Sequence, residues 1–162
     1  MMIAVWVVLG LLVAFFVVNQ IYANQRQKKA LEGGEIVKRP GNYESLAEIF
    51  TIHTMDPKMV VQAITSIDYS RMENVNMKYV PEKDCFLYEG TAKVGSTVLW
   101  KARLSNRGAD DTGMSYIFQF ISWRSNLRIL GMNQLLTAIE KAFLSLDPQA
   151  TVQTQAQNVK IN

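Results

Sequence analysis

The chain of 162 residues opens with an apolar run, from Met1 to Val18, that contains no charged side chain, no polar side chain and no proline. As an α-helix this run would be roughly 27 Å long, close to the roughly 30 Å hydrocarbon core of a bilayer. Trp6 lies within one end of the run and Tyr22 just beyond the other, where aromatic rings favour the lipid–water boundary. We therefore expect residues 1–23 to form a single transmembrane anchor.

Two alternatives to an uncleaved anchor fit this run less well. A cleaved signal peptide needs a basic segment before an apolar core of roughly 7–15 residues, followed by small residues at the cleavage site. No Lys or Arg precedes the run, and Ile21-Tyr22-Ala23 resembles a cleavage site only loosely. A core helix of a soluble protein usually carries a polar stripe, and this run has none.

The charges after the run predict its orientation. Residues 19–41 hold five basic and two acidic residues, which accounts for the net charge of +3, because residues 42–162 hold 12 of each sign. By the positive-inside rule the C-terminal side should face the cytoplasm, and a chain with the single cysteine Cys85 agrees with that reducing compartment. We name the five basic residues the basic collar: Arg26, Lys28, Lys29, Lys38 and Arg39.

The position of the basic collar suggests anionic lipid as a partner and argues against nucleic acid. Basic residues next to a membrane are attracted to anionic lipid headgroups, so we expect the collar to contact the membrane surface. A nucleic-acid-binding protein would instead carry clustered basic residues on its folded domain, and we predict no nucleic-acid partner.

Composition divides the rest of the chain into three parts. Residues 24–41 are polar and basic and contain Gly33-Gly34, which is typical of a linker, although residues 35–38 could add a short edge strand. Residues 42–147 have the pattern of a folded domain. Residues 148–162 are polar, rich in Gln and poor in large apolar groups, which predicts a flexible tail.

Helical spacing of apolar residues occurs three times in the predicted domain. It is found over residues 43–50, over residues 59–67 behind the start signal Asp56-Pro57, and over residues 132–146. Between the second and third helices the period changes to two, which predicts strands. The short connections favour an antiparallel meander, so we expect an α+β domain with a four-stranded sheet packed against two preceding helices and one long C-terminal helix. The predicted strands cover residues 75–79, 86–93, 98–104 and 115–123, with a turn at 81–84 and a longer loop at 106–113.

Residues typical of catalysis or metal binding are few. His53 is the only histidine, and neither it nor Cys85 stands in a metal-ligand spacing. A nucleophilic Cys85–His53 pair lacks any surrounding signature, so we interpret Cys85 as a small apolar residue of a strand. Asp110 and Asp111 lack the further oxygen ligands that Ca²⁺ needs and are interpreted as a solvated loop tip. We predict no catalytic residue, no metal site and no cofactor.

Two features are candidates for interaction surfaces. Trp123, Arg124 and Arg128 gather where the last predicted strand gives way to the last helix, and Trp and Arg are enriched at binding hot spots. The plainer interpretation is a tryptophan at the edge of the core beside solvated arginines. Gly10 and Ala14 form a small-xxx-small pair that would let two anchors approach closely, so a homo-oligomer is a further hypothesis.

These observations favour a non-enzymatic, single-pass membrane protein whose cytoplasmic domain acts as an interaction or assembly module of a membrane complex. The tether would raise the local concentration of the domain near its partners. The alternative is a membrane-tethered domain that binds a lipid or another apolar molecule in a helix-grip-like cavity between sheet and helix. Its candidate lining residues, which ordinary core packing would explain equally well, are Phe86, Tyr88, Trp100, Tyr116, Phe118 and Phe120.

Overall fold

The computed structural model describes residues 2–54, 56–92, 95–124 and 130–157, with side chains from Trp6 onward. Its contacts divide the chain into two units, Met1–Lys38 and Arg39–Asn162. Each unit is described by itself.

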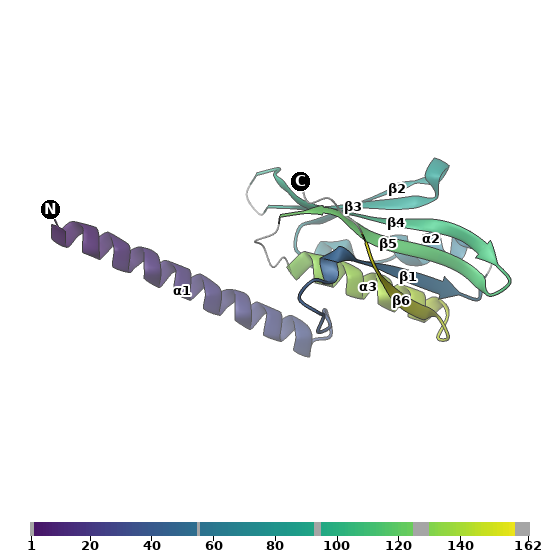
Figure 1. Cartoon of the computed structure of the whole chain (residues 1–162), viewed down its shortest axis with the longest axis horizontal. Coiled ribbons are helices and arrows are strands. Elements are labelled where there is room, and N and C mark those ends of the chain that lie inside the picture. The colour runs from purple at the N-terminus through teal and green to yellow at the C-terminus, as the bar shows by residue number, and fades with distance from the viewer. Residues whose placement is uncertain (1, 55, 93–94, 125–129, 158–162) are drawn as a thin grey trace. The chain divides into compact units, whose positions relative to one another are not determined.

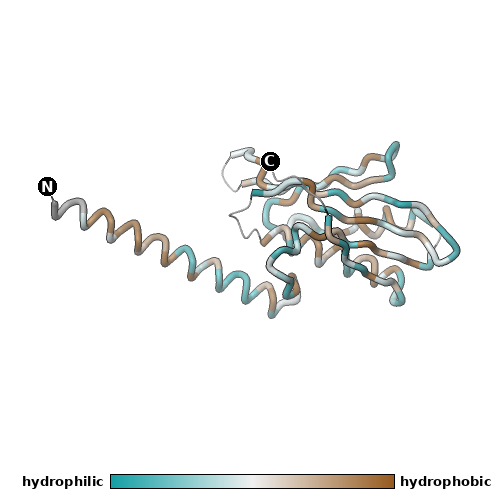
Figure 2. Tube along the Cα trace, viewed as in Figure 1, coloured by the Kyte–Doolittle hydropathy of each residue, from teal (hydrophilic) through white to brown (hydrophobic). Residues whose placement is uncertain are grey.

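The first unit consists mainly of one long helix, α1 (Met2–Glu32). Figure 2 shows that the helix is largely apolar in its first half and that hydrophilic residues are interspersed in its second half. Among the described residues, α1 is the one helix that is long and apolar enough to cross a membrane. Its apolar stretch is not buried by other parts of the protein. The helix therefore continues past the predicted anchor through part of the predicted linker.

Glycine ends helix α1. Gly33 N–H donates to the Lys29 carbonyl oxygen at 2.8 Å, and Glu35 N–H donates to that of Ala30 at 2.8 Å. Gly34, between them, has a φ of 68°, a left-handed conformation that glycine adopts without steric cost. Residues 35–38 form no strand, so the short edge strand considered for them is absent.

The second unit is built on a six-stranded sheet in the order β2-β3-β4-β5-β1-β6, in which all neighbouring strands are antiparallel (Figure 1). Strands β2 to β5 are adjacent in sequence and in space, as the predicted meander requires. The first and last strands extend the sheet beyond them. The strands are β1 (Leu46–Ile52), β2 (Val75–Val80), β3 (Cys85–Thr91), β4 (Val98–Asp110), β5 (Gly113–Trp123) and β6 (Thr151–Ala156).

Helices α2 (Pro57–Thr65) and α3 (Leu130–Leu146) lie on one face of this sheet (Figure 1). The start signal predicted for α2 is confirmed, because the Asp56 side chain accepts from Lys58 N–H and Pro57 occupies the first turn. Three short 3-10 turns complete the unit: Tyr43–Ser45, Tyr69–Arg71 and Pro81–Lys83.

The hydrophobic core lies between the helices and the sheet. Phe143 of α3 stacks on Phe50 of β1 with ring centroids 4.4 Å apart, and it also contacts Tyr116 of β5. Burying aromatic side chains of this size contributes a large share of the hydrophobic free energy of folding. The packing between α3 and the sheet fixes the position of β1, which supplies one residue of the candidate site described below.

The α+β prediction, the two later helices and the four predicted strands are confirmed in outline, but three details are wrong. Residues 43–50 form a 3-10 turn and strand β1 instead of a helix. Residues 151–156 form strand β6, although the sequence predicted a flexible tail. Residues 106–110 continue strand β4, so the connection to β5 is a tight hairpin instead of a long loop.

Candidate functional site

A group of polar side chains surrounds Arg39, where the second unit begins. Its guanidinium donates to Glu48 Oε1 at 3.0 Å and to both oxygens of Glu140, at 3.0 and 2.6 Å. It also donates to Asn133 Oδ1 at 2.8 Å and to Thr137 Oγ1 at 3.3 Å. Strand β1 supplies Glu48 and helix α3 supplies the other three partners. We name these five residues the Arg39 cluster.

The Arg39 cluster is largely shielded from water. The side chains of Arg39 and Glu48 are 8% and 7% exposed, and that of Glu140 is 20% exposed. Burial and the neighbouring Glu140 raise the pKa of Glu48 to about 7, although Arg39 acts in the opposite direction. Within the described residues Glu48 Oε2 is buried and accepts no hydrogen bond.

Burial is the main cause of the raised pKa of Glu48, and the charge of Glu140 adds to it, because one guanidinium cannot balance two ionised carboxylates. With Glu48 and Glu140 both charged the cluster carries a net negative charge in a dry environment. Protonation of Glu48 would remove this charge, and this is the direction in which its pKa is raised. The Arg39 cluster is therefore a buried ionic joint that fastens the start of the second unit to β1 and α3.

The basic collar is divided by this arrangement. Arg39 was expected to contact lipid headgroups, but its guanidinium is buried in the domain, so it belongs to the joint instead. Arg26, Lys28, Lys29 and Lys38 are exposed. Lys28 forms an ion pair with Glu32 one helical turn later, at 3.8 Å, of the kind that contributes little at an exposed site.

The aromatic residues considered as a cavity lining belong to the core. All six side chains are buried, and several rings contact one another directly. Phe118 and Phe120 lie edge to face at 5.0 Å, and Trp100 contacts Phe120 in the same way at 5.9 Å. Contacts of this kind are those of packed side chains, and they favour core packing over a ligand cavity.

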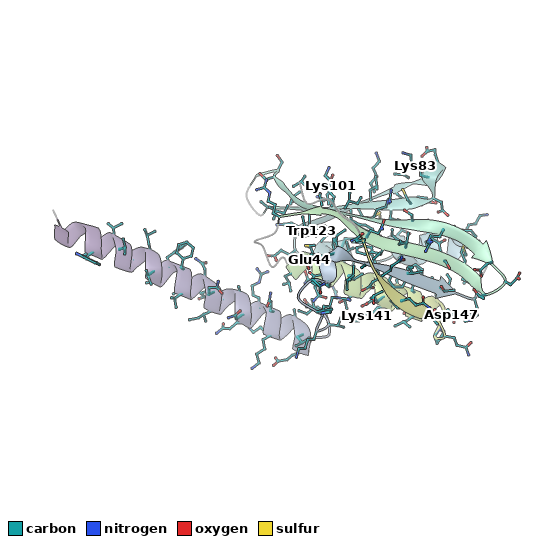
Figure 3. All side chains as sticks on the ribbon, in the orientation of Figure 1. Glu44, Lys83, Lys101, Trp123, Lys141 and Asp147 are labelled. Carbon is teal, nitrogen blue, oxygen red and sulfur yellow. The ribbon has the colours of Figure 1, made fainter. Side chains whose placement is uncertain are left out.

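The tryptophan-arginine candidate is only partly described. Trp123 lies at the end of β5, as Figure 3 shows, and is half-buried against the core. Arg124 is exposed, with its backbone N–H donating to the Leu99 carbonyl oxygen at 3.2 Å. Arg128 lies outside the described residues. Trp123 therefore fits the plainer interpretation of a ring at the edge of the core.

The residues considered for catalysis have structural partners. His53 Nδ1 and its backbone N–H contact Asp147 Oδ2 at 2.7 and 2.8 Å. This pair joins the end of β1 to the end of α3. Cys85 is buried at the start of β3, and Asp110 accepts from Thr112 N–H in the β4–β5 hairpin. Among the described residues, no three His, Cys, Asp or Glu side chains are grouped closely enough to hold a metal ion.

Strand β6 forms an exposed edge of the sheet that sequence reasoning missed. It pairs with β1 on one side only, and all six of its residues are exposed. Natural edge strands are usually protected by charged side chains or proline. The opposite edge strand, β2, follows this rule with Lys78 and the adjacent Pro81, whereas residues 151–157 contain neither charge nor proline. The Thr and Val residues of β6 were the available signal for a strand.

Both ends of β6 are held in place. At its start, Asp147 accepts from His53 and, through Oδ1, from Gln149 N–H at 2.9 Å. At its end, the Gln157 side chain donates to the carbonyl oxygens of Glu44, Leu46 and Phe120, at 3.2, 3.5 and 3.3 Å. The edge is therefore ordered before any partner binds, which lowers the entropic cost of binding.

Comparisons of this chain with protein-family models, with curated proteins and with solved structures found no match.

Proposed function

We propose that this chain is a non-enzymatic, membrane-anchored interaction module that contributes its folded domain to a complex at the cytoplasmic surface of the membrane. The observation that carries the proposal is the ordered and uncharged edge of β6. Its backbone can add a partner strand, which is a common mode of protein recognition.

Three further features support this function. Helix α1 is long and apolar enough to span a bilayer. Between the end of α1 and the buried Arg39 lie the residues from Gly33 to Lys38, a segment that reaches at most about 20 Å even when fully extended. The domain would therefore stay close to the membrane and meet its partners at high local concentration.

The cytoplasmic orientation and the lipid contacts are part of the proposal. The exposed members of the basic collar, Arg26, Lys28, Lys29 and Lys38, would lie near the anionic headgroups of the inner leaflet. Each such residue contributes about 1 kcal/mol close to the surface. The joint at Arg39 would then connect the tethered segment to the two elements next to the β6 edge.

The test is native mass spectrometry of the full-length protein, extracted gently from its own membrane. We expect the chain to be released with protein subunits at a fixed stoichiometry. Release as a single chain that carries a lipid or a small apolar mass would contradict the interaction module and favour the ligand-binding alternative.

A further inference from the structure

The direction of the backbone groups in β6 can be derived from its pairing with β1. Gln157 N–H donates to the Ser45 carbonyl oxygen at 3.2 Å, and β6 continues from there in antiparallel register. In such a ladder alternate residues bond to the neighbouring strand, so Thr151, Gln153 and Gln155 bond to β1. The backbone N–H and C=O groups of the intervening residues point away from the sheet. These residues are Val152, Thr154 and Ala156.

We propose that a second copy of this chain occupies the free edge, with β6 pairing antiparallel to β6 of the other copy about a two-fold axis at Thr154. This inference rests on the proposed function and names its partner. Thr154 would face its own counterpart, and Val152 would face Ala156 of the second copy. Each hydrogen-bonded pair exchanges two bonds, so the three pairs would add about six backbone hydrogen bonds.

The side chains of β6 suit pairing with themselves. On one face the two-fold places Thr154 beside Thr154 and Val152 beside Ala156, and cross-strand Thr–Thr pairs are favourable. On the other face Gln153 would lie beside Gln155. No charged residue occurs in the strand, so the symmetric arrangement sets no like charges opposite each other. A strand with a single lysine near its centre, such as β2 with Lys78, would repel its own copy.

The symmetry also fits two anchors in one membrane. The two-fold axis of an antiparallel edge pair runs perpendicular to the joined sheet. The helix-covered faces of the two copies would therefore lie on the same side of that sheet. Glu48 is linked through Arg39 to helix α3, so each Arg39 cluster lies on the helix-covered face. In the dimer both linkers would leave from the same side, as two chains anchored in one membrane require.

Thr154→Pro should weaken the pairing between two copies while leaving the fold of each copy intact. The backbone N–H of Thr154 points outward, so proline removes a bond to the second copy while keeping the ladder to β1, and edge strands tolerate proline in this orientation. We expect native mass spectrometry of the full-length protein to show twice the 18.3 kDa chain mass for the wild type and its loss in Thr154→Pro. Circular dichroism would confirm that the variant remains folded.

Disulfide trapping in the native membrane tests the register independently. Two Thr154→Cys residues would face each other about 5.5 Å apart between Cα atoms, within the range of a disulfide. Gln155→Cys is the matched control, because its counterpart would lie diagonally about 7–8 Å away, beyond that range. With copper phenanthroline as oxidant we expect about tenfold more linked dimer for Thr154→Cys. Cys85 is buried, and the wild-type chain controls for its reaction.

The outcomes separate this inference from the proposed function. A dimer that persists in Thr154→Pro, as pairing of the anchors through Gly10 and Ala14 would give, overturns the β6 pairing. Equal trapping at positions 154 and 155 overturns the register. A different protein subunit that is lost in Thr154→Pro overturns the second copy as occupant and leaves the interaction module standing. A wild-type chain that is monomeric and without partner overturns both.

Discussion

The pKa of Glu48 makes stability depend on pH in a direction opposite to that of most carboxylates. Its pKa rises from 4.5 to about 7 on folding, because of burial first and Glu140 second. The folded state therefore binds more protons than the unfolded state between these values. The free energy of unfolding should be highest below about pH 4.5 for this group and should fall as the pH rises to about 7. Each unit of pKa corresponds to about 1.4 kcal/mol, so the fall amounts to about 3–4 kcal/mol at most.

Glu48→Gln removes this dependence. Glutamine resembles the protonated carboxyl group: its oxygen can accept from Arg39 and its NH₂ group can donate to Glu140. The variant should be about as stable as the wild type below about pH 4.5 and more stable at pH 8, by up to about 3–4 kcal/mol. Denaturant unfolding of the full-length chain in detergent micelles measures this, with Trp6→Phe as background so that Trp100 and Trp123 alone report.

Glu82→Gln is the matched control, since Glu82 is exposed and lies outside the Arg39 cluster. Hydrogen bonds lower the pKa of Asp68, Asp110 and Asp147 from the ordinary carboxyl value, which is the direction opposite to that of Glu48. A wild-type stability that rises between pH 5 and 8 would refute the reasoning. So would a Glu48→Gln variant that loses stability with pH as steeply as the wild type.

Three further predictions concern packing and topology. Gly90→Ala should destabilise the domain by at least about 1–3 kcal/mol in denaturant unfolding, because its Cβ would lie 2.0 Å from the Trp100 ring; unchanged stability would show that the ring can shift freely. Phe143→Ala should cost about 3–5 kcal/mol through loss of the stacked contact with Phe50, and a cost below about 1 kcal/mol would contradict the assigned core. Asp111→Cys, at an exposed hairpin, should resist an impermeant thiol reagent on intact cells and react after lysis, whereas labelling of intact cells would place the domain outside.

Strands β2 to β4 could be predicted because they follow simple alternation and β5 because it is a strand-length run apolar on both faces, whereas β1 could not. The inward positions of β1 include Glu48 between apolar neighbours, and this buried carboxylate interrupts the apolar alternation. Leu46, Ile49 and Phe50 happen to fit helical spacing as well, and periodicity alone cannot distinguish the two in so short a segment. The inward carboxylate is tolerated because Arg39 binds it, a long-range contact that no local pattern reveals.

Strand β6 was missed for a related reason. It buries no large apolar side chain, so composition resembled that of a flexible tail. Its order depends on the Gln157 side chain and on the His53–Asp147 pair, which join residues distant in sequence. The five basic residues of the collar could be identified from the sequence. That Arg39 is buried in ion pairs could be seen only once the structure placed Glu48 and Glu140 beside it.

The placement of β1 within the sheet has a mechanical consequence. If α1 is anchored in a membrane, as proposed, a pull on it would reach the domain first at Arg39, which bonds to both β1 and α3. Strand β1 is an inner strand with β5 on one side and β6 on the other, so extracting it breaks two ladders of hydrogen bonds together. An edge strand such as β2 or β6 is held by a single ladder. A force on the proposed tether would therefore be borne by a strand that is paired on both sides.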